Sequence, residues 1–153
     1  MVMELYESLL DEFSKVINIP SLKPDSNNSC LIKLPDDGAK IQIEMDKTGD
    51  FLMLASNLGF VPPGRYREML FREALHHNNM PHPRNGTFCY SENTKQLMLM
   101  EYLFIKELNG EKIAAVFEPF AERATLWKQA IEKGEVPSGT ASVRKGGSGM
   151  FGL

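Results

Sequence analysis

The first apolar pattern of the chain is helical. Leu5, Leu9, Phe13 and Val16 follow one another at intervals of three or four residues, while acidic residues, serine and lysine fill the opposite side. This spacing places the apolar side chains on one face of an α-helix. It therefore predicts an amphipathic helix over residues 3–17, which the prolines that follow bring to an end.

The next patterns are those of strands. Residues 30–34 form a short apolar run, and residues 40–46 alternate between apolar and polar positions. In the second run Ile41, Ile43 and Met45 share one face. Such alternation is typical of an antiparallel strand that is buried on one side and exposed on the other.

Turn residues join these strands to each other and to a third one. The sequence Asp36-Asp37-Gly38 predicts a hairpin turn in which the glycine adopts the positive φ angle. Residues 51–56 are apolar at nearly every position. This pattern predicts a strand that is central in the sheet or covered on both faces.

Residues 65–78 predict a second helix, and its apolar face is unusually wide. At 100° per residue the apolar side chains span about 240° of the helix. A helix that covers one sheet needs a narrower apolar face. The helix is therefore either deeply buried or in contact with a second body, and this width predicts a homodimer with Leu70 and Phe71 as its main contacts.

The last part of the ordered chain is a second hairpin followed by a long helix. Residues 86–91 and 95–103 predict paired strands, and the second is apolar on both faces, so both faces should be covered. Asn109 can cap the N-terminus of the final helix, and Gly134 can end it in the left-handed conformation. Pro119 should kink this helix or mark a nearby start.

The predicted order is helix, three strands, helix, two strands, helix. It favours an α+β sandwich in which a twisted antiparallel sheet is packed by helices. The length of 153 residues fits one domain, which we assign to residues 1–134. Residues 135–153 are rich in glycine and serine, so we expect a flexible tail.

Composition narrows the classes of partner. The chain has 17 Lys and Arg against 20 Asp and Glu, a net charge of -3, and an acidic surface repels phosphate. We therefore expect no nucleic-acid partner. No apolar run approaches the roughly 20 residues of a membrane span, and no signal peptide precedes the first helix. Cys30 and Cys89 are interpreted as buried reduced thiols, which agrees with a cytoplasmic location.

The sequence offers no set of residues for catalysis, a metal or a cofactor. His76, His77 and His82 are the only histidines, and adjacent histidines on a helix point about 100° apart. We interpret them as solvated residues near a helix end. Cys89 stands between two aromatic residues, so packing explains it better than a nucleophilic role.

Methionine is the one residue type that suggests binding. Met is flexible and polarisable, so it adapts to varied contacts. Most of the nine methionines can be core residues, but a peptide-binding groove could use some of those on predicted strands: Met45, Met53, Met98 and Met100.

Three stretches together resemble a known family. They are residues 72–78 (REALHHN), residues 86–90 (GTFCY) and residues 95–100 (KQLMLM), followed by a closing helix with Phe117, Phe120 and the Leu126-Trp127 pair. In order, length and acidity the chain, over roughly residues 3–133, resembles the class I chaperones of bacterial type III secretion, the Tir chaperone (CesT-like) family.

The resemblance implies a homodimeric cytoplasmic chaperone without enzymatic activity. Such a protein binds the N-terminal segment of a secreted effector in extended form and keeps it competent for export without ATP. The resemblance also implies contact with the secretion ATPase as a further partner. The proline pair that precedes the second helix and the glycine-rich tail are not features of this family's core.

Two sets of site residues follow from the patterns and the resemblance. Helix one and the sheet are expected to supply the effector-binding residues, among which Ile43 and Met45 are the expected surface positions: Leu5, Leu9, Phe13, Ile41, Ile43 and Met45. The second helix and the strands of the second hairpin are expected to supply the dimer interface: Tyr66, Leu70, Phe71, Cys89 and Met98.

Two other functions remain open from the sequence. The same fold could serve a regulatory adaptor that binds folded proteins. A small-molecule-binding enzyme on an α+β sandwich is a third reading, which would need a closed pocket with a convergent polar cluster.

Overall fold

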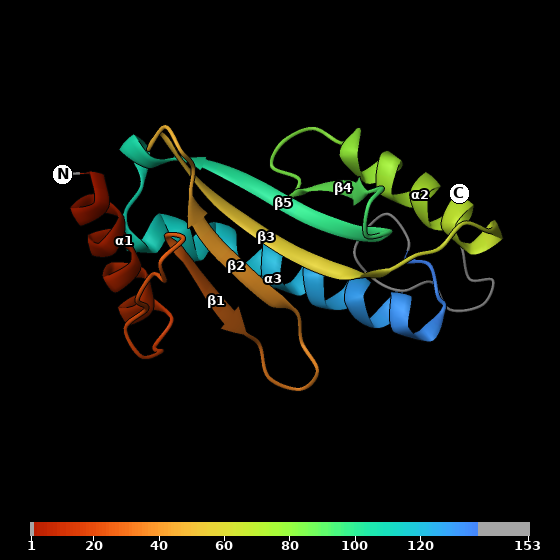
Figure 1. Cartoon of the computed structure of the whole chain (residues 1–153), viewed down its shortest axis with the longest axis horizontal. Helices are drawn as coiled ribbons and strands as arrows, with labels where there is room; N and C mark the ends of the chain where they lie inside the picture. Colours follow the sequence, from red (N-terminus) through yellow and green to blue (C-terminus); the bar gives the residue numbers. More distant parts are fainter. Residues whose placement is uncertain (1, 138–153) are drawn as a thin grey trace.

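The computed structural model describes residues 2–137, and its element order agrees with the sequence prediction. The fold is α+β (Figure 1). The elements are α1 (Val2–Val16), β1 (Ser29–Lys33), β2 (Lys40–Met45), β3 (Phe51–Phe60), α2 (Arg65–Asn78), β4 (Thr87–Ser91), β5 (Gln96–Phe104), the short 3-10 helix η1 (Ile105–Glu107) and α3 (Gly110–Lys133). Most of the predicted flexible tail, residues 138–153, lies outside the described residues.

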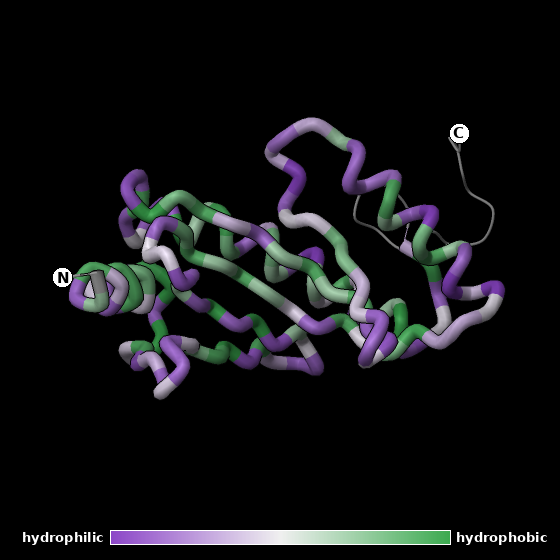
Figure 2. Tube along the Cα trace, turned by 45° about the horizontal axis from the view of Figure 1, so that its top comes forward, coloured by the Kyte–Doolittle hydropathy of each residue, from purple (hydrophilic) through white to green (hydrophobic). Residues whose placement is uncertain are grey.

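The five strands form one antiparallel sheet in the order β1-β2-β3-β5-β4. As expected, β3 is central, but it extends to Phe60 instead of ending near residue 56. The register between β3 and β5 shifts between Asn57 and Gly59, which is a bulge that lets the strand continue. Figure 2 shows that the central strands are hydrophobic for most of their length, whereas α2 alternates between hydrophilic and hydrophobic residues.

The turn between β1 and β2 differs from the prediction. The two positive φ angles belong to Asp36 (58°) and Asp37 (59°), not to Gly38. Both central residues of a tight hairpin turn need positive φ, and aspartate tolerates this conformation better than most residues. Glycine is required at position 38 because a Cβ there would lie 2.7 Å from the Cβ of Leu34.

Helices cover only one face of the sheet, which we call the inner face. In Figure 1 α3 runs along the sheet behind the strands, α1 lies at one end, and α2 lies beside β4 at the other. The α3 helix begins at Asn109, whose side chain accepts a hydrogen bond from the Lys112 N–H, and ends at Gly134 with φ 69°. Both caps confirm the prediction. The helix continues through Pro119, so this proline does not mark its start.

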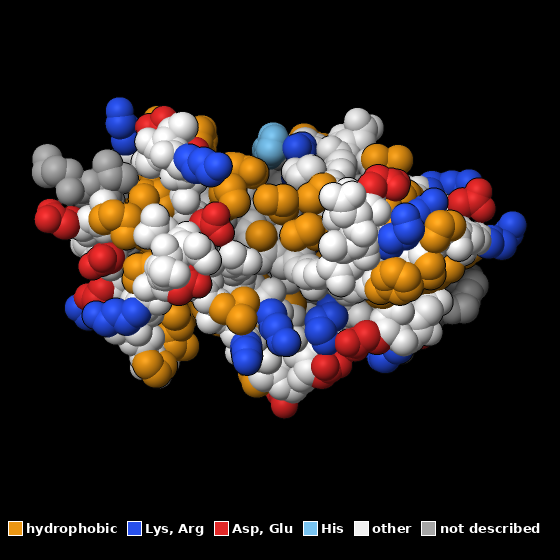
Figure 3. Space-filling view, in the orientation of Figure 1, with side chains coloured by type: hydrophobic (Ala, Val, Ile, Leu, Met, Phe, Trp, Pro, Cys, Tyr) orange, Lys and Arg blue, Asp and Glu red, His pale blue; other side chains and the backbone are white. Residues whose placement is uncertain are grey.

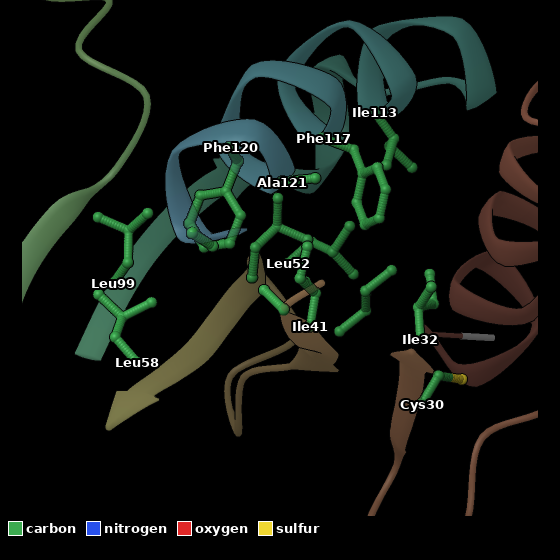
Figure 4. Close-up of a cluster of buried hydrophobic side chains, with 14 of the residues drawn as sticks. Cys30, Ile32, Ile41, Leu52, Leu58, Leu99, Ile113, Phe117, Phe120 and Ala121 are labelled. Carbon is green, nitrogen blue, oxygen red and sulfur yellow. The ribbon is translucent and has the colours of Figure 1, made fainter. Parts of the chain in front are cut away.

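The core lies between α3, α1 and the inner face. Figure 4 shows side chains of α3, among them Phe117 and Phe120, pointing toward Ile41, Leu52 and Leu99 of the strands. Burying one such side chain stabilises the fold by about 1.5–3 kcal/mol. The largest fully buried side chains are Tyr6, Leu10, Phe13, Ile41, Ile43, Leu52, Leu54, Leu58, Leu70, Leu97, Leu99 and Phe120.

Close contact fixes α1 against the start of α3. The ring centroids of Phe13 and Phe117 lie 5.0 Å apart in an edge-on arrangement. The Gly110 N–H donates to the Glu12 carboxylate at 3.0 Å. At the sheet, the Tyr6 hydroxyl lies 3.0 Å from the Ile43 carbonyl oxygen, so α1 is tied to both α3 and β2.

His77 is not a solvated residue as the sequence suggested. It is 3% exposed, and its Nδ1 lies 2.6 Å from Nη1 of Arg123. Burial, followed by the nearby Arg123 charge, lowers the pKa of His77 to about 4. His77 therefore helps to hold α2 on α3 as a neutral ring.

We predict that replacing Gly110 by Ala destabilises the protein by roughly 1–3 kcal/mol, as overpacking does. A Cβ at position 110 would lie 2.6 Å from the Glu12 carbonyl carbon, so α1 must move away from α3. Chemical denaturation measures the free energy of unfolding. Glu111→Ala, at the exposed neighbouring position, is the matched control and should change it little.

We also predict that stability falls between pH 6.5 and pH 4. The unfolded chain binds a proton at His77 near pH 6.5, whereas the folded chain resists it until about pH 4. At pH 5 this difference is worth about 2 kcal/mol. Urea unfolding at pH 7 and pH 5 should show a smaller loss for His77→Gln than for the wild type or for His76→Gln. Equal losses in all three would contradict the role given to His77.

Candidate protein-binding surface

The face of the sheet opposite α3, which we call the outer face, carries an apolar patch that no described element covers. The sequence correctly predicted apolar residues on both faces of the second hairpin, but residues 2–137 cover only the inner face. Figure 3 shows hydrophobic side chains gathered over the middle of this face. We call the following residues of β3, β4 and β5 the outer patch: Phe51, Met53, Ala55, Cys89, Met98, Met100, Tyr102 and Phe104.

Strand register makes the outer patch continuous. Met53 is paired with Tyr102, and Ala55 with Met100, so these side chains are direct cross-strand neighbours. On the other edge of β5, Met98 is paired with Cys89 of β4. Cys89 is exposed, which corrects the prediction that both cysteines are buried; Cys30 is buried as expected.

Aromatic rings form one end of the outer patch. Phe51 lies with its ring centroid 6.2 Å from that of Tyr102 and 5.6 Å from that of Phe104. Tyr102 is 52% exposed and Phe104 is 40% exposed. Exposed aromatic and methionine side chains offer a large adaptable apolar area, and contiguous patches of this kind mark interaction sites.

A groove forms the other end of the outer face. It has a volume of about 660 Å³ and lies between the end of β3 and the last turns of α3. Its apolar lining includes Leu31, Phe60 and Met98, and the side-chain amides of Asn57 and Gln96 bond to each other within it. Apolar surface beside amide groups suits an extended polypeptide, whose backbone needs hydrogen-bond partners.

The β1 edge of the sheet is partly open. Asp25 satisfies the outward-facing groups of Ser29: the Asp25 N–H donates to the Ser29 carbonyl at 2.9 Å, and the Ser29 N–H donates to the Asp25 carboxylate at 3.1 Å. In an antiparallel ladder these outward groups recur at every second residue. The backbone groups of Leu31 therefore also point outward, and they have no hydrogen-bond partner among residues 2–137.

The β4 edge is closed at the corresponding place. The Phe88 N–H donates to the side-chain oxygen of Asn78 at 2.8 Å, and the Asn78 amide donates to the Phe88 carbonyl at 2.9 Å. The last residue of α2 thus occupies the position that an added strand would take. At β1, by contrast, the free backbone groups of Leu31 lie next to an exposed apolar side chain, because Leu31 is 52% exposed.

The residues predicted to bind an effector do not form one surface. Ile43 was expected at the surface, and this is wrong: it is fully buried. Ile41 and Phe13 are also fully buried, and Leu9 is 3% exposed. Alternation shows that a strand has two different faces, but it does not say which face the helices cover. Only Leu5, at 46% exposure, and the partly buried Met45 can meet a partner without rearrangement.

The residues predicted for the dimer interface divide in a similar way. Leu70 is fully buried in the core of its own chain, which corrects its assignment as a main dimer contact. Tyr66 and Phe71 are partly buried. The ring of Phe71 packs edge-on against that of Tyr90, with the ring centroids 4.8 Å apart. Cys89 and Met98 belong to the outer patch.

Sequence reasoning missed the most exposed apolar positions of α2. Met69 is 44% exposed and Leu75 is 67% exposed. Both belong to the wide apolar face seen in the sequence, so the width of that face correctly indicated exposed apolar surface on α2. The error lay in choosing its centre, Leu70, which a helix turns toward its own core.

The described residues carry neither a metal-binding cluster nor a spanning helix. Residues 2–137 contain no group of three or more His, Cys, Asp or Glu side chains that could hold a metal ion. No described helix is long and apolar enough to cross a membrane.

Comparison with solved structures shows that the fold is that of secretion chaperones. The HopA1-SchA chaperone-effector complex is 17% identical, with a TM-score of 0.66, over 82% of this chain and 94% of that one. The Yersinia pestis type III secretion chaperone SycH, solved with a fragment of YscM2, is 16% identical, with a TM-score of 0.59, over 78% and 96%. The ExoT-SpcS complex from Pseudomonas aeruginosa is 12% identical, with a TM-score of 0.58, over 84% and 96%.

The search of curated proteins finds no match to the sequence. The family comparison does: the Tir chaperone protein (CesT) family matches residues 8–128, which is more than half of the chain. The resemblance seen in the sequence is thus confirmed, and the chain belongs to the Tir chaperone protein (CesT) family.

Proposed function

We propose that this protein is a type III secretion chaperone that binds the N-terminal segment of a secreted effector in extended form and keeps it competent for export. The observation that carries the proposal is the free β1 edge on a sheet whose outer patch is open. Family membership supports it, and so does the similar HopA1-SchA structure, which is a chaperone-effector complex.

Strand addition at β1 explains how an unfolded segment is held. An incoming strand would bond to the outward backbone groups of Leu31, which pair with nothing in the described chain. Such pairing recognises backbone and is tolerant of sequence, while alternate side chains provide specificity. Side chains of the added strand on the outer side would lie beside the exposed Leu31.

A homodimer accounts for the exposed face of α2. Met69 and Leu75 expose apolar surface on the side of α2 that faces away from its own core, next to Met80, which is 44% exposed. A stable interface buries about 800 Å² per partner, more than one helix face supplies. We therefore assign α2 together with part of the outer face to the interface, with Cys89 and Met98 as contacts.

The protein so proposed acts without catalysis or a cofactor, in the bacterial cytoplasm. Its partners are a second copy, the effector segment and, at export, the secretion ATPase. Residues 1–134 form the chaperone domain, and the remaining residues form a tail.

The first prediction concerns the dimer. Sedimentation at micromolar concentration should give about twice 17.2 kDa for the wild type. Leu75→Asp with Met69→Asp should give a folded monomer, because both side chains are exposed within one chain. Glu73→Gln on the same helix is the control. A wild-type monomer would contradict the dimer.

The second prediction concerns the β1 edge. Leu31→Pro removes an outward N–H that β2 does not use, so the chain should still fold, as proline is tolerated in edge strands. Its affinity for an effector N-terminal segment should fall about tenfold or more, since the backbone pairing is lost. Calorimetry with N-terminal segments of secreted proteins from the same bacterium measures this.

Leu31→Ala is the matched control because it removes the side chain but keeps the N–H. It should weaken binding only a few-fold. If both variants are folded and bind equally well, the segment does not pair with β1.

A further inference from the structure

A second groove lies on α3, away from the outer patch, and we call it the α3 groove. It consists of two adjoining hollows that share Glu122 and Leu126 as lining residues. One hollow, of about 420 Å³, lies between α3 and the segment that follows β1, and it is lined by Leu34, Pro35 and Ala121. The other, of about 270 Å³, extends to Arg123.

The second hollow is lined by one cationic side chain, Arg123, beside the carboxylate of Glu122, and Arg123 makes no ion pair among the described residues. The described residues contain three ion pairs, and neither Arg84 nor Arg123 takes part in any of them. The Nε atoms of both arginines are buried without a hydrogen-bond partner within residues 2–137. Burial lowers the pKa of Arg123, which means that its surroundings disfavour the charge. The neutral His77 ring is the only side-chain partner of Arg123 among the described residues, so an anion at this place would stabilise the guanidinium charge.

The first hollow is apolar and begins where β1 ends. Lys33 is the last residue of β1, and Leu34 and Pro35 follow it directly as groove lining. A polypeptide paired with the free β1 edge therefore reaches the α3 groove without crossing other parts of the surface. This continuity distinguishes the groove from a site for a free anion such as phosphate, which has no use for an apolar hollow.

We propose that the α3 groove holds the continuation of the polypeptide that pairs with β1. One apolar side chain of this segment enters the hollow beside Leu34 and Leu126, and a neighbouring acidic side chain pairs with Arg123. This inference rests on the proposed function and adds a requirement on the effector sequence. Next to the part that pairs with β1, the effector should have an apolar residue with an Asp or Glu close to it.

The negative charge of Glu122 allows a second test of the charge preference of the groove. Its exposed carboxylate lines both hollows and makes no ion pair among the described residues. It therefore repels an acidic ligand without neutralising Arg123. Removing this charge should strengthen the binding of an acidic segment, whereas removing Arg123 should weaken it.

The first measurement uses short peptides, so it does not depend on effector binding. The probes are acetylated, amidated peptides in which Leu and Glu are separated by zero to three alanines, with matched Leu/Gln peptides. NMR titration should shift the Leu126 methyl and Arg123 Nε–H signals saturably, and the best Leu/Glu peptide should bind at least fivefold more tightly than its Gln match.

Variants then assign the contacts. Arg123→Gln should remove the preference for Glu over Gln, and Glu122→Gln should increase it two- to threefold. Lys133→Gln, at an exposed position of the same helix, is the control. Glu122 is exposed, so its variant keeps the test valid even if Arg123→Gln does not fold. Equal binding of Leu/Glu and Leu/Gln peptides, or of acetate alone with no gain from Leu, would overturn the proposal.

The second measurement tests continuity with β1. The best short peptide should compete with an effector segment and lower the apparent affinity of the protein for that segment. Arg123→Gln should weaken the binding of the same segment about fivefold. If effector segments bind but neither the peptide nor the variant affects them, the groove serves another protein and the inference fails while the proposed function stands. If no effector segment binds, the proposed function fails, and the peptide titration shows independently whether the groove has this chemistry.

Discussion

The structure depends on the coverage of the sheet by helices on one face only. The α3 helix spans the inner face, and α1 is fixed against its start by the contact of Gly110 with Glu12. These two helices bury the inner side chains of all the central strands. The remaining helix, α2, packs beside β4 at one end and buries only Leu70, Ala74 and His77. No described helix is left to cover the outer face, so its apolar residues stay exposed.

This one-sided arrangement explains the composition of the outer face. A sheet face exposed to water in a monomer is normally polar, and on β2 the outward residues Lys40, Gln42 and Glu44 follow this rule. On β3 and β5 the outward residues are instead methionine, alanine and aromatic side chains. Large exposed apolar patches lower solubility and are rare in proteins that act alone. The contrast between neighbouring strands of one face indicates that the central strands, rather than the whole sheet, are shaped for contact with a partner.

Most of the fold followed from the sequence because its signals are local. The helical spacing of Leu5, Leu9 and Phe13 and the caps Asn109 and Gly134 depend on near neighbours in the chain, and the structure agrees with them. The errors concern which side of an element is covered, which depends on distant parts of the chain. Ile43 and Met53 are both apolar residues of predicted strands, yet Ile43 is buried on the inner face and Met53 lies on the outer face. The open β1 edge and the missing counter-ion of Arg123 could not be predicted either, since both are defined by what is absent in space around them.

The binding of an extended segment requires more than apolar area. Ordering an unfolded polypeptide costs conformational free energy at each residue, so weak contacts must extend along its length. A free strand edge supplies such contacts at a regular spacing, and it accepts many sequences because it recognises the backbone. Asn78 blocks strand addition at Phe88 of β4, whereas the outward groups of Leu31 on β1 stay open and the groove linings Leu34 and Pro35 follow Leu31 in the chain. Because pairing at the β1 edge would recognise only the backbone, the specificity of the proposed complex must come from the side-chain contacts beyond that edge.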